Sequence, residues 1–208
     1  MRVKVCGITN YKDAVRVLDQ GVDALGFNFY PSSPRYINPG AARSIIRRMP
    51  PFAVTVGLFV NVTEQSLLAE AARHAGVQVL QLHGDEDPAY CRKLRDWPLI
   101  KVLRIGKSLL QENLEEYPVQ GFLLDVKDDA LYGGTSKSFD WSLAKGIRRI
   151  RPIILAGGLR PDNVREAIRI VEPYGLDVCS GVESKPGKKD TQKLIEFMNE
   201  VRNVISSH

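Results

Sequence analysis

The sequence lacks long apolar runs and has little cysteine. No run approaches the roughly 20 apolar residues of a membrane-spanning helix, and the short apolar start, broken by Lys4, lacks the anatomy of a signal peptide. The three cysteines are Cys6, Cys91 and Cys179, an odd and widely spaced set without a Cys-x-x-Cys pair, which is atypical of a disulfide framework or a zinc site. We therefore expect a cytoplasmic protein with free thiols and no metal.

The chain also lacks a concentrated positive surface, although its net charge is +5. The basic residues are scattered, in short runs such as Arg47-Arg48 and Lys188-Lys189, with no basic stripe interleaved with aromatics. This pattern favours a solvated surface over a nucleic-acid partner. With 44% hydrophobic and 25% charged residues over 208 positions, the composition indicates one globular domain over residues 1–208.

Short apolar runs recur along the chain, each followed by a helical pattern. They are mostly continuous rather than alternating, as in parallel strands covered on both faces. Repeated strand–helix alternation predicts a single (β/α)₈ TIM barrel. An open doubly wound sheet would carry a glycine-rich fingerprint after the first strand, where the chain has Cys6-Gly7-Ile8-Thr9. The predicted strands are Val3–Cys6, Ala24–Phe29, Ala53–Val60, Val77–Leu82, Leu99–Ile105, Gly121–Asp125, Pro152–Leu155 and Leu176–Val178.

Four helices carry the clearest signals. They are expected over Asn10–Asp19 with Asn10 as N-cap, over Thr63–Ala75, after Pro161, and from Asp190. In the second helix, Thr63 is expected to be the N-cap, with Leu67, Leu68 and Ala71 on one face.

Two residues at predicted strand ends could move protons, because TIM-barrel active sites lie at the C-terminal ends of the strands. Cys6 ends the first strand and could act as a thiolate base if nearby cations or helix N-termini lower its pKa; a buried small hydrophobe is the alternative. Asp125 ends the sixth strand, where an apolar mouth would raise its pKa and make it a general acid. It could instead cap a turn or pair with Lys101 or Arg104.

Two further strand-end residues could bind a substrate. Arg35 follows the second strand in a loop stiffened by two prolines, and its planar guanidinium suits a carboxylate; a solvated loop arginine is the alternative. His83 closes the fourth strand and could polarise or orient a substrate, or simply be structural.

The last two loops favour an anion site. Gly157 and Gly158 follow the seventh strand, and Ser180 and Gly181 follow the eighth. Loops at these positions often bind phosphate through backbone N–H groups and a short helix N-terminus, although paired glycines could merely form a turn into a helix. The segment Tyr132–Ser138 lacks the spacing of a nucleotide P-loop and is expected to form a glycine-hinged lid.

Taken together, these motifs make the chain resemble the phosphoribosylanthranilate isomerases of tryptophan biosynthesis. Individually weak, they follow one another at successive strand ends over almost the whole chain. They are Lys4–Thr9, Gly26-Phe27 through Ser33-Pro34-Arg35, Gln81–Gly84, Asp125, Gly133-Gly134-Thr135 with Phe139-Asp140-Trp141, Leu155–Leu159, Asp177-Val178, Ser180–Glu183, Pro186-Gly187 and Lys189-Asp190.

The resemblance implies an Amadori rearrangement of N-(5-phosphoribosyl)anthranilate without cofactor or metal. Asp125 would be the general acid and Cys6 the general base, and Arg35 would hold the anthranilate carboxylate. The phosphate would lie against Gly157, Gly158, Ser180 and Gly181. A rival is another phosphate-binding barrel, such as the aminoaldose isomerase of the imidazole pathway, but that chemistry is usually pictured with carboxylates on both sides.

Two positions depart from the family pattern. Ser136 stands where a second isolated glycine is typical, and Cys179 stands where a serine is usual. If the phosphate site requires a hydroxyl near Cys179, Ser180 must supply it. A monomer and a homodimer are both compatible with the sequence.

Overall fold

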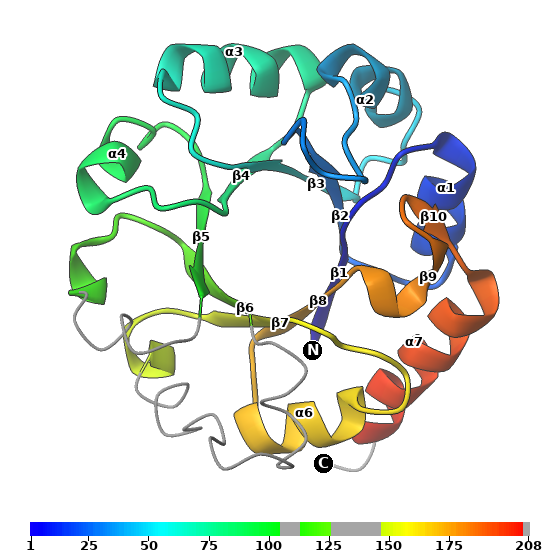
Figure 1. Ribbon diagram of the computed structural model, residues 1–208. Helices are drawn as coiled ribbons and strands as arrows, with labels where there is room; N and C mark the ends of the chain where they lie inside the picture. Colours follow the sequence, from blue (N-terminus) through cyan, green and yellow to red (C-terminus); the bar gives the residue numbers. More distant parts are fainter. Residues whose placement is uncertain (105–112, 126–146, 206–208) are drawn as a thin grey trace.

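Eight parallel strands form a closed barrel in the computed structural model, which describes residues 1–104, 113–125 and 147–205. Figure 1 looks along the barrel axis. The predicted (β/α)₈ architecture is confirmed, whereas the predicted lid Tyr132–Ser138, with Ser136, lies outside the described residues. The strands are β1 (Arg2–Val5), β2 (Ala24–Asn28), β3 (Val54–Phe59), β4 (Val79–Leu82), β5 (Leu99–Arg104), β6 (Gly121–Asp125), β7 (Ile153–Ala156) and β8 (Gly175–Val178).

Pairing of the first strand with the last closes the barrel. Val5 of β1 is in register with Val178 of β8. The first strand ends one residue earlier than predicted, at Val5, so Cys6 is the first residue beyond it. The Cys6 N–H still donates to the Val178 carbonyl oxygen at 2.9 Å, which fixes Cys6 at the mouth of the barrel.

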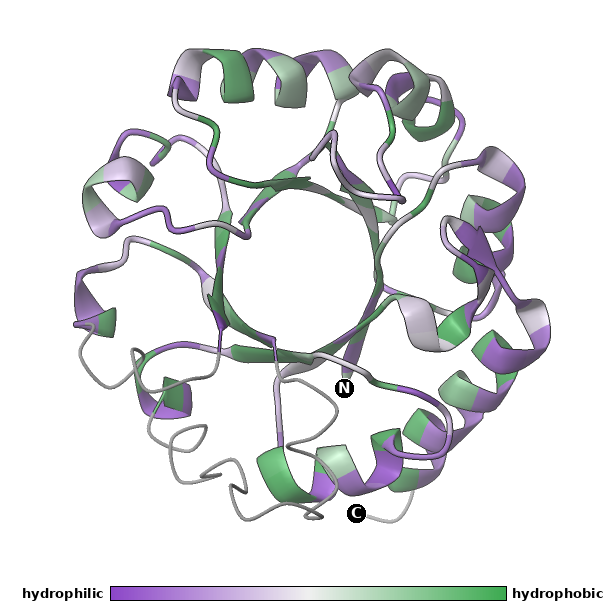
Figure 2. Ribbon diagram, viewed as in Figure 1, coloured by the Kyte–Doolittle hydropathy of each residue, from purple (hydrophilic) through white to green (hydrophobic). Residues whose placement is uncertain are grey.

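Helices surround the barrel, with their apolar sides toward the strands (Figure 2). Asn10 caps the first helix as predicted, accepting from the Asp13 N–H at 2.9 Å. At the last helix, Asp190 accepts from the Gln192 and Lys193 N–H groups. The helices are α1 (Tyr11–Asp19), α2 (Pro39–Ile46), α3 (Gln65–Ala75), α4 (Pro88–Arg92), α6 (Val164–Val171) and α7 (Thr191–Ile205).

The third helix differs from its prediction. It begins at Gln65, after Glu64, whose side chain makes no capping hydrogen bond. Thr63 is therefore one position too early to be the N-cap. Leu67 is 55% exposed while Leu68 is buried, because only one edge of the expected apolar face meets the barrel.

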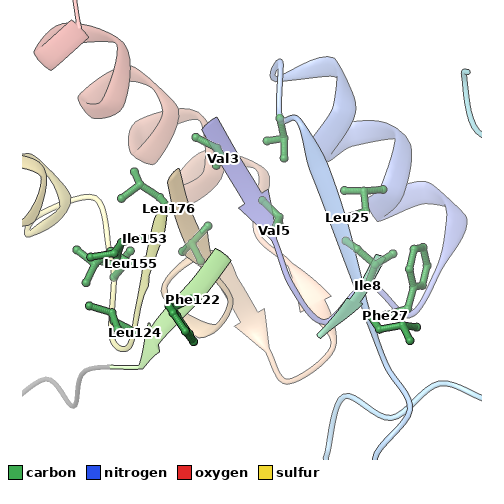
Figure 3. Packing of buried hydrophobic residues seen from close by; sticks show 14 of the residues in the cluster. Val3, Val5, Ile8, Leu25, Phe27, Phe122, Leu124, Ile153, Leu155 and Leu176 are labelled. Atoms are coloured by element: carbon green, nitrogen blue, oxygen red, sulfur yellow. The ribbon is translucent and has the colours of Figure 1, made fainter. Parts of the chain in front are cut away.

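The main core lies between the strands and the helices. Figure 3 shows part of it, where alternate side chains of the strands point outward toward the helices. The labelled residues are Val3, Val5, Ile8, Leu25, Phe27, Phe122, Leu124, Ile153, Leu155 and Leu176. Within the barrel, a small cluster contains Val102, Leu123 and Ala156.

The two ends of the barrel have different chemistry. A cavity of about 460 Å³ is lined by the starts of the strands, including Val54 and Ile100. A smaller cavity of about 230 Å³ lies at the C-terminal ends and is lined by Cys6, Arg35 and Asp125. The reactive groups lie in the smaller cavity. No helix in the described part of the chain is both long enough and apolar enough to cross a membrane.

A buried ion pair holds the loop after β4. Lys101 of β5 donates to the Glu86 carboxylate at 3.0 Å and to the Gly84 carbonyl oxygen at 2.6 Å. Glu86 also accepts from the backbone N–H groups of Gly84 and Asn61. These contacts fix the loop that begins at His83.

We predict that Lys101→Met destabilises the protein by about 3–5 kcal/mol, because it leaves the buried Glu86 charge without its cation. Urea unfolding measures this change. The exposed Lys93→Met is the control, and adding Glu86→Gln to Lys101→Met should recover part of the loss. A Lys101→Met protein as stable as wild type would contradict the assignment.

Candidate active site

The smaller cavity gathers almost all of the predicted site residues. Seven of the eight line it, and the eighth, Gly181, directly follows the lining residue Ser180. They come from β1, from the loop after β2, and from the ends of β4, β6, β7 and β8. The lining residues predicted from sequence are Cys6, Arg35, His83, Asp125, Gly157, Gly158 and Ser180.

Cys6 is buried in surroundings that favour a thiolate. A hydrogen bond from the Cys179 thiol lowers the pKa of Cys6 well below its usual value, against the effect of burial, and the charges of Lys4 and Lys189 lower it further. The pKa of Cys179 is raised correspondingly. Within the pair, loss of a proton is therefore favoured at Cys6 over Cys179. The cations required by the base hypothesis are thus Lys4 and Lys189.

The Lys189 ammonium contacts the residues that follow β1 and β8, which are Cys6 and Cys179. It donates to the Cys6 carbonyl oxygen at 2.6 Å and to the Glu183 carboxylate at 2.9 Å. Both side chains of this ion pair are buried. A buried charge acts on its neighbours with little screening, so Lys189 stabilises the Cys6 thiolate.

We predict that Lys189→Met raises the pH midpoint for alkylation of Cys6 by iodoacetamide, by about one pH unit. The sign follows from the chemistry, because only the thiolate is alkylated and removing a cation raises the pKa of the thiol. The exposed neighbour Lys188→Met is the matched control. Identical midpoints in the two variants would exclude an electrostatic effect of Lys189.

Lys4 and Asp177 form a second buried ion pair, one layer deeper in the barrel. Their charged atoms lie 2.9 Å apart. Burial raises the pKa of Asp177 to about 6, although Lys4 opposes the shift. The other carboxylate oxygen of Asp177, Oδ1, and the Gln81 Oε1 are buried without a hydrogen-bond partner among the described residues. Both residues line the cavity, so these oxygens are acceptors available to a ligand.

Asp125 pairs with His83, and not with either of the cations considered from sequence. The His83 Nε2 lies 3.3 Å from the Asp125 Oδ2, whereas Lys101 pairs with Glu86 and Arg104 with Asp85. The Asp125 side chain is 38% exposed, which is more solvated than the enclosed apolar mouth expected. Gln81 Nε2 lies 3.4 Å from His83 Nδ1, so a short polar chain orients the carboxyl group.

Arg35 has a carboxylate partner within the protein. Its Nε lies 3.1 and 3.0 Å from the two Glu183 oxygens, and its Nη2 lies 2.6 Å from Oε2. Glu183 thus binds one edge of the guanidinium, while no hydrogen bond within the described residues occupies Nη1. Because a guanidinium has five N–H donors, its outer edge can still bind a second carboxylate. Gly7, at φ +78°, makes room for Arg35, since an added Cβ would lie 2.8 Å from the Arg35 Cδ.

The loops after β7 and β8 present free backbone donors. In the described part of the chain, the N–H groups of Gly157, Gly158, Ser180 and Gly181 have no hydrogen-bond partner. Gly157 and Gly158 have φ of 88° and 62°, a conformation that favours glycine, and Asn163 donates to the Gly158 carbonyl oxygen at 2.9 Å. A short 3₁₀ turn, Ser180–Val182, begins one residue after the end of β8, with Cys179 between them. Such an arrangement suits an anion.

Several site residues were not singled out as functional from sequence. Lys4, Lys189 and Glu183 gain their roles from contacts with residues distant in the chain, and only the fold reveals these. Asp177 carried a usable signal, because it interrupts an apolar strand as Asp125 ends one. The described residues include no group of three or more His, Cys, Asp or Glu side chains arranged to hold a metal.

Comparison with known proteins decides the family. The family model described as N-(5'phosphoribosyl)anthranilate (PRA) isomerase matches residues 3–200. The chain belongs to this family. An N-(5'-phosphoribosyl)anthranilate isomerase of Trichlorobacter lovleyi is 45% identical over 99% of this chain and 100% of its own length. That of Moorella thermoacetica is 48% identical over 100% of this chain and 92% of its own.

Solved structures of the family agree with the fold. Phosphoribosyl anthranilate isomerase from Thermotoga maritima superimposes with a TM-score of 0.85 at 42% identity, covering 98% of this chain and 99% of its own. Another structure of the enzyme, in complex with reduced 1-(o-carboxyphenylamino)-1-deoxyribulose 5-phosphate, gives a TM-score of 0.84 at 40% identity, covering 98% and 99%.

Proposed function

We propose that this chain isomerises N-(5'-phosphoribosyl)anthranilate to 1-(2-carboxyphenylamino)-1-deoxyribulose 5-phosphate, with Asp125 as general acid and Cys6 as general base. The observation that carries this assignment is the pairing of a low-pKa buried thiol with a carboxyl group in one cavity. The two groups stand at the C-terminal ends of β1 and β6, with β8 and β7 between them in the barrel. Such separation suits two proton transfers to different atoms of one substrate.

The reaction begins at the ring oxygen of the ribose. The Asp125 carboxyl group donates its proton to this oxygen as the C1–O bond breaks, and the nitrogen lone pair forms a C1=N Schiff base. The Cys6 thiolate then removes the proton from C2, and its electron pair forms the C1=C2 bond of an enolamine. Protonation at C1 and loss of the enol proton give the ketone. Proton transfers suffice, so the step needs no cofactor.

The three polar regions of the cavity match the three parts of the substrate. The outer edge of Arg35 would bind the anthranilate carboxylate, since its inner edge is held by Glu183. The unpaired oxygens of Asp177 and Gln81 would accept hydrogen bonds from sugar hydroxyls. His83 would keep Asp125 oriented toward the ring oxygen, and the free N–H groups after β7 and β8 would bind the phosphate.

The direct test is turnover of purified protein on two substrates. We expect the protein to convert N-(5'-phosphoribosyl)anthranilate, and chromatography of the product measures this conversion. The aminoaldose phosphate of the imidazole pathway should be converted slowly at most. Preference for the second substrate would support the rival barrel isomerase instead.

The phosphate site gives a separate prediction. A Cβ at Gly181 would collide with the Leu159 carbonyl oxygen, so Gly181→Ala should push apart the two loops that carry the free donors. We expect KM to rise about ten- to a hundredfold, the effect of losing one charge-assisted hydrogen bond, with a smaller change in kcat. The nearby exposed Ser184→Ala is the control. An unchanged KM would place the phosphate elsewhere.

We further propose that the protein acts in the cytoplasm as a monomer or homodimer, on a free small molecule and without nucleic acid. The structure of monomers generated from the dimeric T. maritima relative supports considering both assembly states. Sedimentation velocity over a range of concentrations distinguishes them, and a larger assembly would contradict the proposal.

A further inference from the structure

Two of the three cysteines lie next to each other at the ends of neighbouring strands. Cys6 follows β1 and Cys179 follows β8, directly after the paired residues Val5 and Val178. Adjacent strands lie about 4.8 Å apart, and natural disulfides join Cα atoms roughly 4.4 to 6.8 Å apart. The pairing of β1 with β8 therefore brings the two backbones within the range of a disulfide.

The two side chains also share one direction. Two residues earlier, Lys4 and Asp177 form their ion pair inside the barrel, and side chains two residues apart point to the same face of a strand. The Cys179 Sγ lies 4.0 Å from the Glu183 Oε1, and the Cys6 and Cys179 thiols shift each other's pKa. Both cysteines line the cavity, so a small solute that enters the cavity meets both sulfurs.

We propose that Cys6 and Cys179 form an oxidative modification site, at which a hydroperoxide converts the dithiol to a disulfide and inactivates the enzyme reversibly. The Cys6 thiolate attacks one peroxide oxygen, the O–O bond breaks, and hydroxide (or alkoxide) leaves as Cys6 becomes a sulfenic acid. The Cys179 sulfur then attacks the Cys6 sulfur. The S–O bond breaks, the S–S bond forms, and water leaves with the thiol proton. The peroxide is reduced by two electrons and the pair of sulfurs is oxidised by two.

The charges around the pair suit both steps. Lys4 and Lys189 stabilise the Cys6 thiolate, which is the form that peroxide oxidises. Cys179 supplies a resolving thiol from the end of the neighbouring strand.

The third cysteine provides an internal reference. Cys91 is fully buried, and burial raises the pKa of its thiol to about 11. It does not line the cavity. It should therefore remain a thiol under conditions that oxidise the pair.

The experiment treats the folded wild-type protein and Cys179→Ser with hydrogen peroxide and then counts thiols after denaturation. We expect the wild type to lose two thiols and keep one, and to give a Cys6–Cys179 linked peptide by mass spectrometry. Turnover should fall in proportion to the linked fraction and return with dithiothreitol. Cys179→Ser should give no such peptide, and its Cys6 should proceed to sulfinic acid, which dithiothreitol does not reverse.

The effect on turnover rests on the proposed role of Cys6, but the cross-link does not. A wild type that forms no linked peptide, and whose Cys6 over-oxidises as in Cys179→Ser, would overturn the modification site. Full cross-linking with undiminished turnover would instead overturn the role of Cys6 as base, while the modification site itself would stand.

Discussion

Replacing Cys6 by serine is expected to lower kcat about 10²- to 10⁴-fold, the usual contribution of a positioned general base. A serine hydroxyl at this position is almost the same size, so the cavity and the Lys4–Asp177 pair should be retained. It remains protonated at neutral pH, however, and cannot take the C2 proton. KM should change little, because the proposed role places Cys6 beside the reacting carbon rather than at either anionic end of the substrate.

The proposed role of Cys6 also predicts how turnover depends on pH. In the proposed role the active form of Cys6 is the thiolate, and its pKa lies well below the usual value. Wild-type kcat/KM should therefore fall as the pH drops through that lowered pKa, at a lower pH than the one at which an ordinary thiol titrates. Cys91→Ser is the control and should retain wild-type turnover. Substantial activity in Cys6→Ser would remove Cys6 from the role of base.

Replacing Asp125 by asparagine is expected to lower kcat by a similar factor, about 10²- to 10⁴-fold. The amide occupies the same space and can still lie beside His83, 3.3 Å from the carboxylate oxygen in the wild type. It has no acidic proton to give to the ring oxygen, so the furanose should open slowly. Steady-state turnover measures the loss.

A matched control separates acid catalysis from general electrostatics. Asp85→Asn removes an exposed carboxylate at the same end of the barrel and should leave kcat close to wild type. A comparable loss in both variants would mean that the charge of the barrel mouth, rather than a proton from Asp125, supports the reaction.

Repetition made the fold predictable from sequence. Most strands are continuous apolar runs because both of their faces are covered, as in Gly121–Asp125, and the observed strands follow the predicted runs closely. The N-cap residues of the helices were harder to predict. Asn10 was correctly predicted, whereas Thr63 was wrong, because the start of α3 depends on how the preceding loop leaves the barrel rather than on Thr63 itself.

The position of the candidate site was predictable, but its electrostatics was not. In a parallel barrel the C-terminal ends of all strands lie at the same end of the barrel. Cys6 and Asp125 could therefore be placed there from their positions in the sequence alone. The effect of Lys189 on Cys6 could not be predicted, because Lys189 reaches it from a two-stranded hairpin, β9 (Glu183–Lys185) and β10 (Lys188–Lys189). The partner of Arg35 was likewise hidden, since Glu183 is 148 residues away in the chain.

The closure of the barrel by β1 and β8 also determines when the site can form during synthesis. Lys4 and Asp177 are 173 residues apart, so the first strand leaves the ribosome long before its partner exists. Until then the edge of β1 is unpaired and the Cys6 thiol is without Cys179, Lys189 and Glu183. Long-range pairing of this kind slows folding and exposes strand edges to aggregation. The thiol at position 6 is thus made long before the residues that give it its chemistry.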